Sequence, residues 1–444
     1  MTNVLNPFHP TPESEARTRK RSLFSNPLFW LLLICTEIVF LQYPMYRFMG
    51  PIIALLLGYL YFIKRETIFV TVFIILANTD LKAVLISSVS FQQLLFAFIA
   101  VDLVLQVKLS TMIKSFLCAS LALVMLLQLF LVGFMDMPSV FYTFLFAFAL
   151  VLQFCQYRDR KEEMIEKLTF AIMIIVGLIA LHTCITGGVT FQDEENMSII
   201  RRGTLGVGVG DANFSCLLLC TGVASAFNCR SVNRILCWIF AGLMISAMLV
   251  TLSTTGFIAL IVVLLLSVFT NVKLEKKLRN AILVVLFILL LVQIYLLLPP
   301  EYRIKNLDAY IARMESKYLA LVNDDYSTLT TGRSSNAEIY LGYIHRQSPL
   351  RILFGGNTLI PPSLHCGASH NTYIDFLLRF GYVGAAILLF FVVRSFFRTL
   401  AGDKNSRYRK VSLCLKVLYL FFAFTLSIYN HATFAMMFFV FWIL

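Results

Sequence analysis

Residues 370–384 read HNTYIDFLLRFGYVG, and the fold follows from the change of character within this stretch. His370 and Asn371 end a long loop rich in polar residues, and the residues after them are predominantly apolar. Gly381 and Gly384 bracket one turn of the helix that this apolar run predicts. The stretch indicates a polar loop followed by a helix that enters a membrane. The first hypothesis is therefore chemistry at this boundary between water and lipid.

The composition of the whole chain supports a membrane protein. Of its 444 residues, 59% are hydrophobic and 14% are charged, whereas at most about half of the residues in a soluble domain are apolar. The 37 lysines and arginines outnumber the 24 acidic residues. Because these positive charges cluster between apolar segments, they are typical of cytoplasmic loops in membrane proteins. They are therefore explained without a nucleic-acid partner.

Apolar segments recur along the chain, several at about the length of ~20 residues that crosses a bilayer and others shorter. They lie at residues 28–46, 49–63, 67–84, 91–107, 115–134, 139–156, 168–187, 204–228, 235–252, 256–271, 280–299, 371–393, 412–429 and 431–444. Basic clusters fall on alternate connections, which predicts that both termini lie in the cytoplasm. We expect an all-α polytopic membrane protein with about 12–14 transmembrane helices.

Four regions follow from this pattern. We expect a cytoplasmic tail at 1–27, a first transmembrane part at 28–299, an extracytoplasmic loop at 300–370 and a last transmembrane part at 371–444. The long loop lies between late spans, on the side opposite to the basic clusters.

The long loop carries patterns of its own. Between Ile304 and Leu321 apolar residues recur at steps of three and four, which predicts an amphipathic helix. A Ser-x-x-Glu pattern at Ser335 predicts a second helix that begins there and ends before Pro349. The loop should therefore form a helical cap, either packed on the membrane domain as a lid or lying on the outer leaflet.

Three arginines lie on the predicted outer side. Arg201 and Arg202 precede a glycine-rich stretch at 203–210, and Arg333 lies between the two loop helices. An anionic ligand would explain them, because guanidinium groups match phosphate oxygens and exposed backbone N–H groups can add to such a site. Alternatively, the glycines allow close helix packing and the arginines meet lipid headgroups.

The histidines of the loop are candidates for acid–base chemistry. His370 is accompanied in the loop by His345 and His365. Because histidine titrates near neutral pH, it is suited to take a proton from a sugar hydroxyl. A histidine metal trio is the alternative, but acidic or cysteine ligands at helical spacing are absent from the sequence around it.

Cys216 and Cys220, four residues apart on one predicted helix, are interpreted as buried packing residues. We expect no metal and no cofactor.

The stretch at 370–384 resembles a motif of O-antigen ligases and of the related O-antigen and capsular polysaccharide polymerases. His370 and Asn371, nine residues, Gly381, two residues and Gly384 reproduce the pattern His-[Asn/Ser/Gln]-x9-Gly-x-x-[Gly/Thr/Val]. The many spans, the large late outer loop and the outer arginines are similar to that family as well. The resemblance covers roughly residues 160–400.

Two further stretches carry the resemblance. The arginine pair followed by Asp211 and Asn213 resembles the family's Arg…Gly…Asp-Pro-Asn stretch, with Ala212 in place of proline. The Thr-Gly-Arg sequence that ends at Arg333 resembles the loop arginine motif. The chain departs from the family at Ser253, where many members have Ser-Arg-Gly and this chain has Ser-Thr-Thr-Gly.

The resemblance implies a metal-independent glycosyltransferase of the GT-C type in a bacterial inner or plasma membrane, with an extracytoplasmic active site. Its donor would be a glycan linked to undecaprenyl diphosphate. His370 would deprotonate the acceptor hydroxyl, and the diphosphate would be stabilised by Arg201, Arg202 and Arg333. Asn371 would hold a sugar hydroxyl or orient the histidine.

Three functions remain open at this point. A polymerase would use a second lipid-linked oligosaccharide as acceptor, as in capsule, exopolysaccharide and O-antigen biosynthesis, alongside a flippase and a chain-length regulator. A ligase would use the lipid A core of lipopolysaccharide. We favour the polymerase, because the loop is large and the Thr-Gly-Arg motif resembles the capsular and exopolysaccharide members. From another class, a lipid-linked oligosaccharide transporter would also need cations among many spans, but it would not need the histidine and glycine spacing.

Overall fold

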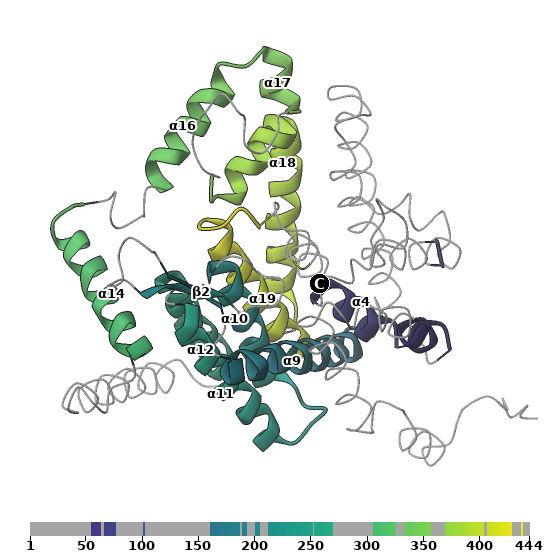
Figure 1. Cartoon of the computed structure of the whole chain (residues 1–444). Helices are drawn as coiled ribbons and strands as arrows, with labels where there is room; N and C mark the ends of the chain where they lie inside the picture. Colours follow the sequence, from purple (N-terminus) through teal and green to yellow (C-terminus); the bar gives the residue numbers. More distant parts are fainter. Residues whose placement is uncertain are drawn as a thin grey trace, which may run out of the picture.

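The computed structural model describes residues 55–63, 66–76, 101–102, 160–186, 189–192, 200–204, 212–251, 253–269, 305–325, 333–356, 369–403, 406–428 and 437. The predicted cytoplasmic tail, the predicted span at 280–299 and most of the first six predicted spans lie outside these residues. Figure 1 shows the arrangement of the described elements.

Helices make up most of the described residues (Figure 1). They are η3 Tyr59–Ile63, α4 Thr67–Leu76, α9 Lys161–Thr186, α10 Ala212–Asn228, α11 Arg234–Thr251, α12 Thr254–Phe269, α14 Lys305–Val322, α16 Arg333–His345, α17 Pro349–Phe354, α18 Thr372–Ala401 and α19 Arg407–Ala423. Among the described helices, α9, α11 and α18 are long and apolar enough to cross a membrane, and α4, α10 and α12 are shorter apolar helices. The described residues are thus mainly helical and compatible with a helical membrane protein, and the total of about 12–14 spans stays a prediction.

Helix α10 lies at the centre of the helices that follow residue 160. It packs against α9, α11, α12 and α19, and nearly all of its side chains are buried. Its sequence, ANFSCLLLCTGVASAFN, contains no charge and is apolar or small on every face. A helix of this kind is stable only when other helices cover it all round.

A short hairpin is an addition to the expected helices. β1 (Val189–Gln192) pairs antiparallel with β2 (Ile200–Thr204), with Val189 opposite Thr204 and an irregularity in the register before Gln192. β2 lies against α10 and α11. Arg201 and Arg202 are therefore strand residues, and the described helix within the span predicted at 204–228 is α10, Ala212–Asn228.

The predicted loop at 300–370 contains described helices, and some of their boundaries differ from those expected. The predicted amphipathic helix is confirmed as α14. α16 begins at Arg333, two residues earlier than expected, so Ser335 lies inside the helix and not at its cap position. α16 ends at His345, before Pro349, and that proline begins α17. Proline is favoured in the first turn of a helix, where its missing N–H is not needed.

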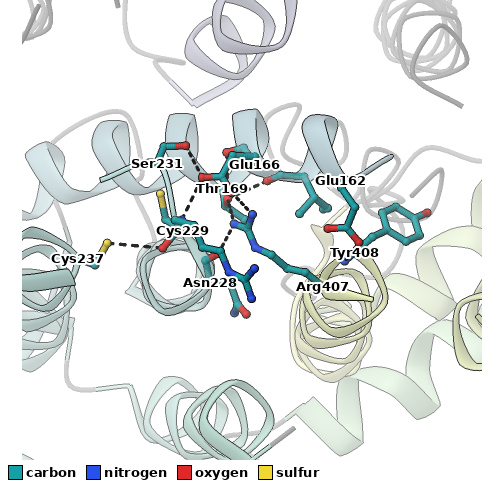
Figure 2. Close-up of polar contacts among 11 residues, drawn as sticks. Glu162, Glu166, Thr169, Asn228, Cys229, Ser231, Cys237, Arg407 and Tyr408 are labelled. Carbon is teal, nitrogen blue, oxygen red and sulfur yellow. Dashed lines mark hydrogen bonds and ion pairs between the residues drawn. The ribbon is translucent and has the colours of Figure 1, made fainter. Parts of the chain in front are cut away.

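A polar cluster joins α9, α10 and α19 at one end of the bundle (Figure 2). The guanidinium of Arg407 forms an ion pair with Glu166 and donates hydrogen bonds to the carbonyl of Asn228 and to Thr169. Glu166 also accepts from Ser231, in the loop after α10. These residues are called the Arg407 cluster below.

The same cluster caps α19. Glu162 Oε1 accepts hydrogen bonds from Ser406 Oγ at 2.6 Å and from Tyr408 N at 3.0 Å. Ser406 is in turn the N-cap residue of α19. A carboxylate near a helix N-terminus is favourable because it faces unpaired N–H groups and the positive end of the helix dipole. α9 begins at Lys161, seven residues before the apolar run predicted at 168–187.

Candidate functional site

His370 lies in a backbone corner just before α18. Its φ is 50°, and within the described ranges only Asp324 shares a positive φ among non-glycine residues. The left-handed conformation costs an ordinary residue about 1 kcal/mol, so it persists only where neighbouring contacts hold it. Such residues are enriched at functional sites, which makes this corner the starting point for the candidate site.

Asn371 holds one side of the corner as the N-cap of α18. Its Oδ1 accepts hydrogen bonds from Tyr373 N at 2.9 Å and from Ile374 N at 3.3 Å. Asparagine is among the preferred cap residues because its short side chain reaches the unpaired N–H groups of the first turn. The side-chain oxygen of Asn371 is therefore engaged by the helix.

The end of α19 holds the beginning of α18 in place. Thr372 Oγ1 donates to the carbonyl of Leu426 at 2.6 Å and accepts from Ile428 N at 2.9 Å. Ser369 Oγ lies 3.1 Å from Ser427 Oγ. The corner that contains His370 is thus fastened to the segment that follows α19.

Gly381 breaks α18 into two helices. Its φ of 61° and ψ of −174° are non-helical, in a region that is essentially restricted to glycine. A Cβ at Gly381 would lie 2.4 Å from the carbonyl carbon of Leu353, and one at Gly355 would lie 2.1 Å from the carbonyl oxygen of Arg379. Gly356 N donates to the same oxygen at 2.9 Å.

The break changes the interpretation of the motif glycines. The sequence predicted that Gly381 lies in a regular turn of helix, but its backbone is non-helical. Gly381 instead allows the end of α17 to cross α18 with the two backbones in contact (Figure 1). Gly384 is buried in the second helix. That second helix, 382–401, is about 30 Å long at 1.5 Å per residue, which is sufficient to cross a bilayer.

Helix α16 packs against the first part of α18. Tyr340 and Ile344 form a small apolar cluster with Ile374 and Leu378. His345 Nε2 lies 2.9 Å from Tyr382 Oη, directly after the break.

These contacts fix the position of α16 relative to α18. The last residue of α16, His345, lies beside the break, and Tyr340 and Ile344 contact α18 before the break. Arg333, the first residue of α16, precedes the residues of this helix that contact α18.

A buried hydrogen bond joins the starts of α10 and α12. Ser253 Oγ donates to Asn213 Oδ1 at 2.8 Å and accepts from Gly256 N at 3.1 Å. Asn213 and Ser253, which belong to two stretches singled out by the family resemblance, are thus adjacent. This pairing was not predicted, although both stretches were noted in the sequence.

The Asn213–Ser253 pair and the His370 corner lie at the same end of the bundle. The last residue of α10, Asn228, contacts the first residue of α19, Arg407. Since the end of α10 meets the start of α19 and the two helices pack against each other, they run antiparallel. Both contain 17 residues, so their other ends also lie close together. The start of α10 and the end of α19, which holds the corner, are therefore opposite to the Arg407 cluster.

Other candidates have different positions. Asp211 and His365 lie outside the described residues, and of Arg201 and Arg202 the structure describes only the strand that contains them. His345 is engaged by Tyr382.

The two cysteines of α10 pack against neighbouring helices. Cys216 Sγ lies 2.9 Å from Thr251 Oγ1, and Cys220 Sγ donates to the carbonyl of Gly256 at 3.7 Å. Both side chains are buried, which fits the interpretation of these cysteines as packing residues.

Sequence reasoning missed Asp375. It is a fully buried carboxyl group behind the corner. The available signal was a single acid in the otherwise apolar run YIDFLL.

These contacts define a class of site: a histidine on a rigid corner of backbone at one end of a helical membrane bundle, with an arginine-bearing cap helix alongside. No family model matches this chain, and no curated protein is significantly similar to it in sequence.

Proposed function

We propose that the protein is a membrane glycosyltransferase of the O-antigen ligase and polymerase type, with His370 as its general base. The observation that supports this most strongly is the corner itself, in which a histidine with a left-handed backbone is fastened between a capped helix and the end of α19. The Asn213–Ser253 pair lies at the same end of the bundle and adds polar groups. Arg333 begins α16, which packs against the first part of α18 and brings a cation.

The proposed reaction is a direct displacement at the anomeric carbon of the donor glycan. The acceptor hydroxyl gives its proton to His370 as its oxygen bonds to that carbon. The bond from the carbon to the diphosphate oxygen breaks, and the electron pair leaves with undecaprenyl diphosphate. Attack from the face opposite to the diphosphate inverts the configuration.

The leaving diphosphate gains negative charge as the bond breaks. Preorganised guanidinium groups stabilise such charge most in the transition state, which is the role assigned to Arg201, Arg202 and Arg333. A rigid corner suits a base, because displacement of a catalytic group by about 1 Å can lower a rate by ~100-fold. The proposal requires no metal ion or cofactor.

The acceptor we favour is a second lipid-linked oligosaccharide, so that repeated transfer lengthens a polysaccharide. The large cap, with α14, α16 and α17, supports this choice over the lipid A core of a ligase. The protein would then act in a bacterial inner or plasma membrane beside a flippase and a chain-length regulator.

The test uses purified full-length protein, oligosaccharide linked to undecaprenyl diphosphate, and a chelator. We expect the wild type to form a ladder of longer glycans and His370→Ala to form none. His345→Ala is the matched control: it removes a histidine of the same cap that is hydrogen-bonded to Tyr382, and we expect it to keep most of the activity.

Each other outcome has a defined meaning. A ladder formed by His370→Ala would contradict the proposed base. Transfer by the wild type to lipid A core alone would identify a ligase. Failure with both acceptors would reject the glycosyltransferase and favour a lipid-linked oligosaccharide transporter.

A further inference from the structure

Asp375, in the first turn of α18, is a buried carboxyl group whose hydrogen bonding is incomplete. Its side chain is 0% exposed. Oδ1 accepts a short hydrogen bond from Ser369 Oγ at 2.6 Å, and within the described residues Oδ2 has no hydrogen-bond partner. Ser427 and the guanidinium of Arg379 also lie close enough to act on this carboxyl group. Burial of a carboxyl group is costly unless hydrogen bonds and nearby charges compensate for it.

The bond to Ser369 determines how that hydroxyl is used. A carboxylate only accepts hydrogen bonds, so the single proton of the Ser369 hydroxyl points to Asp375. Ser369 Oγ then accepts from Asn371 N, 3.2 Å away, and it also lies 3.2 Å from the carbonyl oxygen of Asn371 and 3.1 Å from Ser427 Oγ. Ser369 thus links Asp375, Asn371 and Ser427.

This arrangement encloses His370. Ser369 and Asn371 are its two neighbours in the chain, and the hydrogen bond from Asn371 N to Ser369 Oγ closes a ring of backbone around it. The ring is compatible with the observed φ of 50°. The carboxyl group of Asp375 orients the hydroxyl that closes the ring.

We infer that Asp375 is a positioning residue for His370, acting through the Ser369 hydroxyl. The kinetic consequences of this inference rest on the proposed function. The role is separate from folding, because the start of α18 has its own attachments: Asn371 caps it and Thr372 joins it to Leu426 and Ile428. None of these bonds uses Asp375.

Three single variants and one double variant test the inference in the full-length protein. Asp375→Ala and Ser369→Ala should each lower kcat about tenfold or more, while the KM for the lipid-linked donor stays within about twofold. Asp375→Asn keeps an oxygen that accepts from Ser369 and should recover most of the rate. Because both residues act through one hydrogen bond, the double variant Asp375→Ala/Ser369→Ala should be no slower than the slower single variant.

A second measurement does not depend on activity. Diethyl pyrocarbonate modifies accessible imidazoles, and mass spectrometry gives the rate at each histidine. We expect the rate at His370 to rise about threefold or more in Asp375→Ala, because the half-buried ring is released from its corner. The rate should stay at the wild-type value in Asp375→Asn, and His345 should react equally in all variants.

Several results would overturn the inference: full activity in Asp375→Ala, an equal loss in Asp375→Asn and Asp375→Ala, or unchanged reactivity of His370 in Asp375→Ala. An equal loss in both would mean that the negative charge matters and not the hydrogen bond. If the wild type transfers no glycan, the proposed function fails, and the reactivity of His370 still decides whether Asp375 positions it.

Discussion

At the scale of single residues, Gly381 is the position where the least change is tolerated. Gly381→Ala would place a methyl group 2.4 Å from backbone atoms of Leu353 at a φ of 61°. We expect a loss of about 3 kcal/mol or more of unfolding free energy, because neither backbone can move away. The measurement is the apparent melting temperature in detergent, together with glycan transfer.

Gly342→Ala serves as the control for the same substitution. Gly342 lies in α16, and an added Cβ meets nothing within 4 Å. Alanine is favoured over glycine in a helix by up to about 1 kcal/mol, so the melting temperature should stay the same or rise. Equal melting temperatures for the two variants would show that α17 does not cross α18 as described.

A second prediction at this scale concerns Cys229, which follows α10. Burial raises the pKa of its thiol to about 11. The thiolate is the form that reacts with maleimide, and at pH 8 only about 0.1% of Cys229 is present as thiolate. Labelling measured by mass spectrometry should be slow at pH 8 and rise about tenfold per pH unit toward pH 10. Cys229 labelled at pH 8 as fast as in unfolded protein would contradict this burial.

At the scale of helices, the Arg407 cluster determines how α9, α10 and α19 meet. The side chains of Arg407 and Glu166 are 11% and 24% exposed. Glu166→Gln leaves a mostly buried guanidinium without its counter-charge, and breaking such a pair costs roughly 3 kcal/mol. We expect a clear fall in the apparent melting temperature.

Glu163→Gln is the matched control on the same helix. Glu163 is 41% exposed and forms ion pairs with Arg160, which is 63% exposed, and with Lys167, which is 34% exposed. Exposed pairs contribute about 0–1 kcal/mol, so this variant should melt close to the wild type. A similar fall in both variants would mean that loss of charge on α9, and not the buried pair, is responsible.

At the scale of the whole molecule, the predicted topology puts the two ends of α9 on opposite sides of the membrane. Cys184 is exposed near the end of α9, and Arg230 is exposed beside the Arg407 cluster. With all other cysteines replaced, a membrane-impermeant maleimide should label Cys184 in intact cells or spheroplasts. It should not label Arg230→Cys until the membrane is opened, because basic clusters stay in the cytoplasm. Labelling of both residues from outside, or the reverse pattern, would reject the topology.

The sequence by itself determined the class of fold and the position of several helices. Bilayer length and helical periodicity are local properties, so α11, α12 and α14 begin and end close to the residues predicted. The β1–β2 hairpin escaped prediction because strands this short carry little periodic signal. His370 was proposed from the sequence as a candidate site residue because of its side-chain chemistry and its spacing to Gly381 and Gly384.

Only the tertiary structure decided what surrounds that residue. The break at Gly381 depends on the crossing with Gly355, which is 26 positions away, and the Ser253–Asn213 bond spans 40 positions. The Ser369–Ser427 contact spans 58 positions, and it joins the segment after α19 to the hydroxyl group that donates to Asp375. Contacts over such separations depend on how helices pack, and packing leaves no periodic trace in the chain.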